Sequence, residues 1–391
     1  MNRRNFIRVS SLATGSLMVP KFLKAFDGRL LQSNGKVLVV IQLSGGNDGL
    51  NTVVPFRNDT YYRMRPGLSI GAAEVLPLND EAGLNPQMTG LKELYDQGWL
   101  TIVNNVGYPN PNRSHFRSMD IWHSASDADQ NWATGWLGRY LDAECAKGKP
   151  VSTAIEVDDT LSLAMKGEKI KALAVENPAL LYRTIKNVQA EDNHVPGNES
   201  LDYLYKTLAE TRSGASYIYE QSKIYSTSAE YPGTDIGKHL RTVAELIISG
   251  SHTTVYYCEL GGFDTHIGQK AKQGNLLKQY SDALNVFVQD LKDNHRLDDV
   301  TVLTFSEFGR RVEQNASGGT DHGTANNVFI INGALKKPGI YNETPDLEKL
   351  DEGDLIYRVD FREIYATLLK KGLGVDDRSI LKKEFRYLDF I

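Results

Sequence analysis

Cysteine is scarce in this sequence: its 391 residues include only two, Cys145 and Cys258. Two cysteines are too few for a zinc site built from thiolates or for a framework of disulfides. They could form one bridge in an oxidising compartment, but the place of Cys258 in a predicted core strand favours two unpaired, buried thiols. Carboxylate oxygen and imidazole nitrogen remain as the donors for a metal site.

Basic residues are also under-represented in the body of the chain. The first 36 residues hold seven Lys and Arg and one Asp, so the remaining residues hold 37 basic and 48 acidic side chains. This acidic body argues against nucleic acid as the main partner, because a surface that binds nucleic acid is usually basic. The composition, 41% hydrophobic and 24% charged, is typical of a globular protein with one large α/β core or two domains.

The N-terminal segment lacks the length and apolarity of a permanent membrane span, since its most apolar part, Val9 to Val19, contains serine and glycine. Just before it, Arg3-Arg4-Asn-Phe6-Ile7 resembles a twin-arginine export signal, in which paired arginines and one polar residue precede two apolar residues. We therefore predict an export signal over residues 1–30, the twin-arginine translocase as partner during export, and a periplasmic or extracellular protein. The alternative is a basic amphipathic helix, and no A-x-A cleavage motif is evident.

The strongest structural signal is the segment Val37 to Leu43, a short run of β-branched and aliphatic residues interrupted only by Gln42. Such a run, bounded by glycine, predicts a strand that is buried on both faces. The loop Ser44-Gly-Gly-Asn-Asp48-Gly follows it, and ligands of open α/β sheets bind beyond the carboxyl ends of strands. Asp48 is therefore either a carboxylate at a binding site or part of a simple turn.

Segments with strand and helix patterns alternate along the rest of the chain. Strands are predicted at residues 100–106, 152–157, 172–175, 253–260, 300–305 and 328–332, and helices at 88–97, 115–124, 130–145, 236–249, 276–294 and 361–372. This alternation predicts an α/β fold with a doubly wound, mostly parallel sheet flanked by helices, in a single domain over residues 31–391. The polar, Tyr-rich residues 190–235 are predicted to form a helical insertion or lid over the sheet.

Acidic and histidine side chains gather where the predicted strands end or begin. The set consists of Asp48, Asp264, His266, Glu307, Asp321 and His322. The spacing of Asp264 and His266 puts both side chains on one side of an extended segment. Because carboxylate oxygen and imidazole nitrogen bind zinc, magnesium or manganese, we predict one or two divalent metal ions at this set.

Several motifs resemble the signatures of an exported family of unknown function, domain of unknown function 1501. They are Val39-Val-Ile-Gln-Leu-Ser-Gly-Gly-Asn-Asp-Gly-Leu-Asn-Thr52, Arg113-Ser-His-Phe-Arg117, Gly261-Gly-Phe-Asp-Thr-His266, Ser306-Glu-Phe-Gly-Arg310 and Gly319-Thr-Asp-His-Gly323. The motifs occur in order over residues 37–375. That family is placed in the alkaline phosphatase-like superfamily, whose members include phosphatases, phosphodiesterases, sulfatases and cofactor-independent phosphoglycerate mutases.

The resemblance implies a parallel-sheet fold with a two-metal site. Asp48 matches the aspartate that binds one metal after the first strand, and Ser114, at a helix start, is the best match to the nucleophile. A plain helix N-cap is the alternative role for Ser114. Asp264 and His266 match a later Asp and His pair, although the superfamily more often has three residues between the two and this chain has one.

The last part of the implied metal site can be assigned in two ways. In the first, Asp321 and His322 are the superfamily's Asp-His pair and its final His is missing. In the second, which we prefer, Glu307 and Phe308 occupy the place of the pair, since they directly follow the strand at 300–305, and His322 is the final His. Phe308 then stands where a ligand would be, so one metal would be weakly held or absent, unless Asp321 compensates.

The function that the resemblance implies is metal-assisted hydrolysis of an anionic ester, carried by a small molecule or a polymer. Clamps for the ester are Arg113, Arg117, Arg310 and Arg311, each of which could instead be surface charge. The residues after Ser114 lack the C/S-x-P/A-x-R context of common sulfatases, so a phosphate ester fits better than a sulfate ester. The alternative is a non-catalytic exported binding or assembly protein on a degenerate phosphatase scaffold.

Overall fold

The fold is known from a computed structural model, which describes residues 35–146, 154–187 and 199–391. The predicted export signal at residues 1–30 lies outside this described part of the chain, as does the start of the predicted lid. Within the described part, no helix combines the length and the apolarity needed to cross a membrane.

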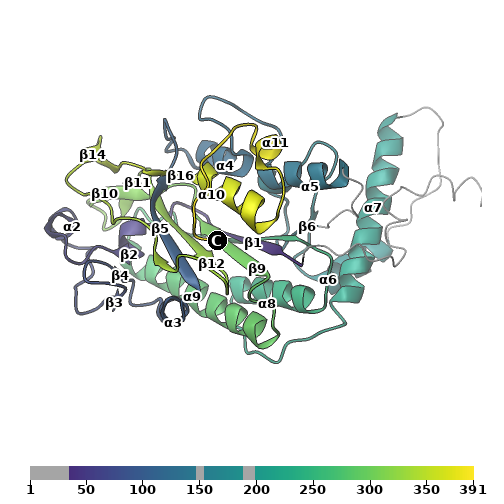
Figure 1. Cartoon of the computed structure of the whole chain (residues 1–391), viewed down its shortest axis with the longest axis horizontal. Coiled ribbons are helices and arrows are strands. Elements are labelled where there is room, and N and C mark those ends of the chain that lie inside the picture. The colour runs from purple at the N-terminus through teal and green to yellow at the C-terminus, as the bar shows by residue number, and fades with distance from the viewer. Residues whose placement is uncertain (1–34, 147–153, 188–198) are drawn as a thin grey trace, which may run out of the picture.

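Among the described residues, nine strands form one sheet with β1 (Val37–Leu43) near its middle (Figure 1). β1 pairs in parallel with β8 (Val255–Leu260) and β9 (Val300–Phe305). The strand order is β13-β5-β12-β9-β1-β8-β6-β7, with β16 beside β5. The other strands are β5 (Leu100–Gly107), β6 (Ala154–Glu156), β7 (Leu173–Ala174), β12 (Asn326–Ile331), β13 (Gly339–Ile340) and β16 (Val359–Asp360). Only β12 runs antiparallel to its neighbours in this described sheet, so the predicted mostly parallel α/β fold is confirmed.

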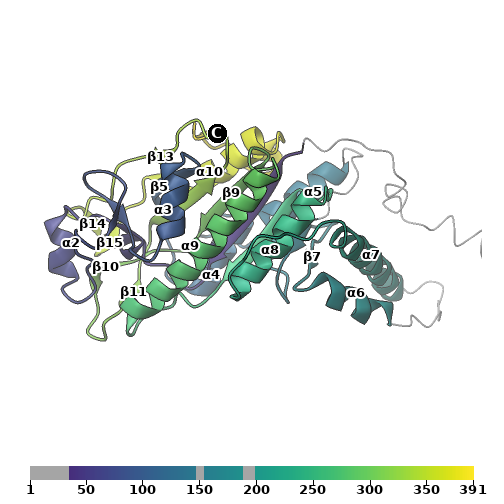
Figure 2. The same ribbon diagram turned by 90° about the horizontal axis from the view of Figure 1, so that it is seen from below.

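Helices cover both faces of the sheet (Figures 1 and 2). One face carries α3 (Thr89–Asp96), α8 (Asp235–Ile248) and α9 (Gln269–Asp293), and the other carries α4 (His115–Ser124), α5 (Trp136–Ala146), α10 (Phe361–Thr367) and α11 (Asp377–Leu381). Successive residues of β1 alternate between the two cores: Val39 packs with the first set of helices and Val40 with the second. This double burial explains why the strand is apolar throughout.

Smaller elements surround the ends of the sheet. They are α2 (Asp59–Met64), the strands β2 (Val53–Val54), β3 (Leu76–Pro77) and β4 (Gly83–Leu84), the hairpins β10 (Arg310–Gln314) with β11 (Thr320–His322) and β14 (Leu350–Asp351) with β15 (Asp354–Leu355), the 3-10 turns at Gly49–Asn51 and Leu163–Met165, and a π-helical turn at Leu368–Gly372. The helices α6 (Pro178–Lys186) and α7 (Glu199–Gln221) lie beyond the edge strand β7 (Figure 2). The described part of the predicted lid thus consists of α7, at the β7 edge, and of turns and coil after it.

Two helices begin six or more residues away from their predicted start. α5 begins at Trp136 instead of residue 130, because Gly135 abuts the backbone of the turn at Leu163 and donates a hydrogen bond to the carbonyl of Lys166 (2.8 Å). α9 begins at Gln269 instead of residue 276, and its first turns bury polar side chains instead of apolar ones. The hydrophobic pattern therefore missed the part of α9 that faces the candidate site.

Candidate metal centre

Three segments meet beyond the carboxyl ends of the central strands. The loop after β8 carries Asp264 and His266, the β10–β11 hairpin after β9 ends with His322, and the loop after β5 leads to His115, the first residue of α4. The loop after β1 comes so close to the loop after β8 that a Cβ on Gly45 would lie 2.4 Å from the backbone nitrogen of Asp264. Glycine is required there, and its φ of 114° is also one that other residues rarely adopt.

Three imidazoles surround one carboxylate oxygen. Oδ1 of Asp264 lies 3.0 Å from Nε2 of His266, 3.3 Å from Nε2 of His322 and 3.6 Å from Nε2 of His115. The Nε2 atoms of His266 and His322 are themselves 3.0 Å apart. Ligand atoms of His115, Asp264 and His322 all lie within 4.8 Å of one another, so these residues offer one common cation site.

In each of the three imidazoles, Nδ1 lies within hydrogen-bond distance of an acceptor of the protein. Nδ1 of His322 donates to the backbone carbonyl of Arg113 (2.7 Å). Nδ1 of His115 lies 2.9 Å from Glu307, and Nδ1 of His266 lies 3.1 Å from Asp321. Because carbonyl and carboxylate oxygens accept hydrogen bonds, each Nδ1 can carry the proton of a neutral imidazole, and its Nε2 lone pair is then available to a metal ion. Imidazoles that bind a metal in proteins are oriented in this way.

The arrangement of nitrogen lone pairs and one ionised carboxylate in the cluster would be stabilised by a cation. Lone pairs on three Nε2 atoms face one another and a carboxylate, which is repulsive unless a proton or a metal ion lies between them. Burial opposes ionisation of Asp264, but the hydrogen bond and charge of Arg310 outweigh it and lower the pKa of that carboxyl to about 2. The Glu307 hydrogen bond raises the pKa of His115, whereas burial lowers the pKa of His322. Nε2 of His115 is a buried atom without a hydrogen-bond partner, and its lone pair could instead coordinate a bound divalent ion.

Glu307 was predicted to be a metal ligand, but in the structure it contacts Nδ1 of His115, on the side of the imidazole away from the cluster. Its side chain is fully buried, and Oε1 accepts from the backbone N–H of Gly45 (2.9 Å) as well as from His115. Its neighbour Phe308 packs its ring against the imidazoles of His115 and His322, with centroids 4.9 and 4.8 Å away. Phe308 is therefore an apolar wall of the centre.

Asp48 was also predicted to bind metal, but its carboxylate lies outside the cluster. Its side chain is fully buried and forms an ion pair with Arg65 (2.6 Å), whose side chain is equally buried. Asp48 also accepts hydrogen bonds from the side chain of Gln269 and from the backbone N–H of Leu50 (3.2 Å). A guanidinium thus holds the place of a cation at this carboxylate.

The arginines predicted to clamp an ester are already engaged. Arg310 is fully buried and donates to four backbone carbonyls and to Asp264 (2.7 Å). Arg117 donates to the carbonyls of Ala128 (3.0 Å) and Gln130 (2.5 Å). The partly exposed Arg113 binds Asp354 (2.7 Å), and Arg311 lies 3.7 Å from the same carboxylate. All four predicted clamp arginines therefore have partners within the protein.

Ser114 occupies the N-cap position of α4, between the cluster residue His115 and Arg113, whose carbonyl holds His322. It is exposed, and its side chain makes no capping hydrogen bond, so the hydroxyl is not used as a plain helix cap. His115 itself was not among the predicted ligands. Its place in the motif Arg113-Ser-His-Phe-Arg, next to the predicted nucleophile, was the signal that could have identified it.

We expect Asp48→Asn to lower the free energy of unfolding by about 3–5 kcal/mol, because it leaves the Arg65 guanidinium buried without its counter-charge. The variant should nevertheless bind as much zinc as the wild type. Denaturant unfolding and metal analysis after dialysis against zinc check both outcomes, with the exposed Asp80→Asn as a matched control. Loss of zinc from a folded Asp48→Asn protein would contradict the assignment of Asp48 to stability and not to metal binding.

Solved structures with distantly similar folds come from several enzymes. A sulfatase from Pseudoalteromonas sp. is 12% identical over 94% of this chain and 72% of that chain, with a TM-score of 0.41. A protein in the alkaline phosphatase superfamily from Vibrio parahaemolyticus is 13% identical over 91% and 71%, with a TM-score of 0.40. The lipoteichoic acid synthase LtaP from Listeria monocytogenes is 10% identical over 79% and 68%, with a TM-score of 0.37. Similarity at this level says nothing about activity.

No curated protein sequence matches the chain. A family model described as a protein of unknown function, DUF1501, matches residues 99–386, which is more than half of the sequence. The resemblance that the motifs predicted is thereby confirmed, and the chain belongs to the DUF1501 family.

Proposed function

We propose that the protein is an exported, metal-dependent hydrolase of phosphate esters. The observation that carries this proposal is the convergence of three Nε2 atoms on Asp264, with every Nδ1 held by an acceptor. A hydrogen bond at Nδ1 fixes the orientation of an imidazole whose Nε2 binds a metal. If the cluster were only a structural ion pair, there would be no reason for all three histidines to have such a hydrogen bond.

We propose a single resident ion, held by His115, His322 and Asp264, with His266 as a further donor. Three imidazoles and one carboxylate suit zinc better than magnesium, which prefers oxygen ligands. Bound there, the ion would act as a Lewis acid toward the oxygens of the ester. The ion pair of Asp48 with Arg65 is the reason for proposing one ion instead of two.

Ser114 is the proposed nucleophile. Its Oγ would lose its proton and form a bond to the phosphorus of the ester, while the bond from phosphorus to the alcohol oxygen breaks and that oxygen takes up a proton. Water would then attack the phosphoserine, releasing phosphate and returning a proton to Oγ. The first-turn N–H groups of α4, a ten-residue helix, would stabilise the anionic ester beside it. This assigns the binding of the anion to the helix N-terminus, because the predicted arginine clamps are engaged elsewhere.

A non-catalytic binding protein on the same scaffold is the second candidate. The observation that favours it is that all four predicted clamp arginines have partners within the protein itself, Arg311 through Asp354. A binding protein could use the same centre to hold a metal ion or an anion without turnover. The two candidates differ in whether an ester is consumed.

We expect the purified wild type to bind one divalent ion per chain after dialysis against zinc. His115→Ala and His322→Ala should each lower zinc affinity by more than about tenfold, and Glu307→Ala should lower it by roughly 10- to 100-fold through loss of the Nδ1 acceptor. Mass-spectrometric metal analysis with a competing chelator measures this, and the exposed His252→Ala serves as control. Absence of zinc from the wild type, or unchanged affinity in the His115 and His322 variants, rules the centre out.

Ser114→Ala should reduce hydrolysis of a phosphate ester by at least about 100-fold, because removal of a nucleophile abolishes the covalent route. The assay compares p-nitrophenyl phosphate, bis-p-nitrophenyl phosphate and p-nitrophenyl sulfate with the zinc-loaded protein. Ser379→Ala, at an exposed position of α11, is the matched control and should retain the wild-type rate. Equal rates for Ser114→Ala and wild type would remove Ser114 as nucleophile, and no hydrolysis of any ester by the wild type would favour the binding role.

We also propose export through the twin-arginine translocase, supported by the Arg3-Arg4 motif. Replacing Arg3 and Arg4 with Lys should retain the protein in the cytoplasm of a bacterial host that carries this translocase, because Lys lacks the fork geometry of paired guanidinium groups. Cell fractionation measures the distribution, and Arg8→Lys is the control. An exported double variant would show that the motif is not an export signal.

A further inference from the structure

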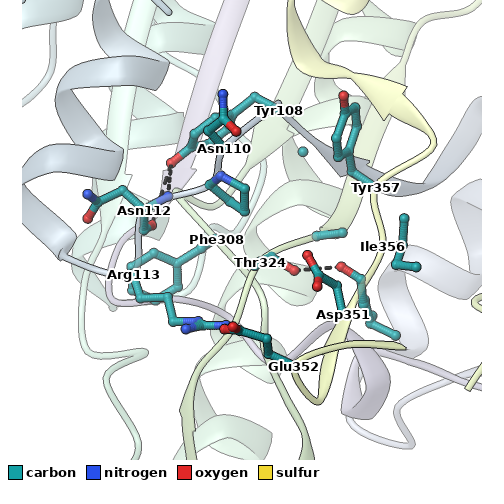
Figure 3. Close-up of a pocket in the computed structure, with 14 residues that line it drawn as sticks. Tyr108, Asn110, Asn112, Arg113, Phe308, Thr324, Asp351, Glu352, Ile356 and Tyr357 are labelled. Atoms are coloured by element: carbon teal, nitrogen blue, oxygen red, sulfur yellow. Dashed lines mark hydrogen bonds and ion pairs between the residues drawn. The ribbon is translucent and has the colours of Figure 1, made fainter. Parts of the chain in front are cut away.

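A pocket of about 370 Å³ opens beside the metal centre. It lies between the loop after β5 and the β14–β15 hairpin with the residues that follow it (Figure 3). The pocket and the centre share two residues: the ring of Phe308 lines the pocket and packs against two of the imidazoles, and Arg113 lines the pocket while its carbonyl holds His322. A volume of this size is at the lower end of the range for small-molecule sites.

The walls of the pocket combine polar groups with aromatic faces. Asn110 and Asn112 project from the β5 side, Asp351 and Glu352 from the hairpin, and the Tyr357 ring stands across the space from Asn112 (Figure 3). Amide side chains bind hydroxyl groups as donors and as acceptors, and carboxylates accept hydrogen bonds from hydroxyl groups. Aromatic rings provide flat apolar contact for the carbon face of a ring-shaped ligand.

The charged residues that line the pocket indicate whether the anionic phosphate or the alcohol part of an ester would bind there. Its charged lining residues are Arg113, Asp351 and Glu352, and the Arg113 guanidinium is already bound to Asp354 (2.7 Å) and lies 3.6 Å from Glu352. The wall is therefore negative on balance, which disfavours an anionic group in the pocket. The Arg113 guanidinium offsets the charge of Glu352, so Asp351 is the main attraction for a cationic group. The amide side chains and aromatic rings around it suit an uncharged, hydroxyl-bearing group, and binding of a cation instead is one outcome of the test below.

We propose that this pocket binds the alcohol part of the substrate and that this part is a sugar ring or a similar uncharged polyol. The inference rests on the proposed function: the phosphate would bind at the metal centre and at the start of α4, and Arg113, directly before Ser114, connects that position to the pocket. The substrate class is thus a phosphorylated carbohydrate, free or within a polymer.

Binding of sugars can be measured without metal or turnover. Saturation-transfer NMR on the full chain is recorded with methyl glycosides of glucose, galactose, mannose and N-acetylglucosamine, and with choline and benzyl alcohol as cationic and apolar probes. We expect saturation of at least one glycoside, and little of choline or benzyl alcohol. Treatment with a chelator should leave the glycoside signal unchanged, so the outcome is independent of the metal centre.

Pocket variants locate the bound sugar. Tyr357→Ala and Asp351→Ala should each weaken glycoside binding about fivefold or more through loss of a ring contact or a hydrogen-bond acceptor. Tyr182→Ala, which removes a tyrosine from the distant helix α6, is the matched control and should bind as the wild type does. No saturation of any glycoside, stronger saturation of choline or benzyl alcohol, or unchanged binding in both pocket variants would overturn the proposal. If glycosides bind but no ester is hydrolysed, the pocket assignment stands and the proposed hydrolysis fails.

Discussion

The guanidinium of Arg310 is the interaction on which the candidate centre depends. It is fully buried and joins three loops that are far apart in sequence, through the carbonyls of Gly46 after β1 (2.7 Å), Phe263 after β8 (3.0 Å) and Thr320 in the β10–β11 hairpin (2.9 Å). It also binds Asp264 and keeps that carboxyl ionised. Since a planar guanidinium offers five donors in a fixed geometry, one side chain sets both the spacing of the loops and the charge at their meeting point.

Two carboxylates at the ends of the central strands have contrasting surroundings. Asp48, after β1, is fully buried and neutralised by Arg65, which leaves no access for an ion. Asp264, after β8, keeps about half of its side chain exposed and faces three imidazoles with directed lone pairs. Each carboxylate thus binds a buried guanidinium, Arg65 at Asp48 and Arg310 at Asp264, but only Asp264 is also exposed and within reach of three imidazoles. This asymmetry is why a single-ion centre fits the chain better than the two-ion site implied by the family resemblance.

Much of the fold could be predicted from local patterns, whereas the partners of the site residues could not. β1, β9 and α4 have the predicted bounds, because unbroken apolar runs and a helix start after a proline-rich loop are local signals. The pairing of Asp48 with Arg65, and the polar first turns of α9 that also contact Asp48, depend on contacts across the fold and leave no periodic trace. His115 was missed because it was interpreted as the start of an amphipathic helix, while its carboxylate partner Glu307 is 192 residues away.

The central claim is that His115, His322 and Asp264 form one cation site, beside which His266 is a further donor. X-ray diffraction from zinc-soaked crystals, recorded on both sides of the zinc absorption edge, tests it most directly. We expect one anomalous peak per chain within about 2.0–2.2 Å of Nε2 of His115, Nε2 of His322 and an oxygen of Asp264. No peak among these side chains, or a peak only at Asp48, would contradict the account.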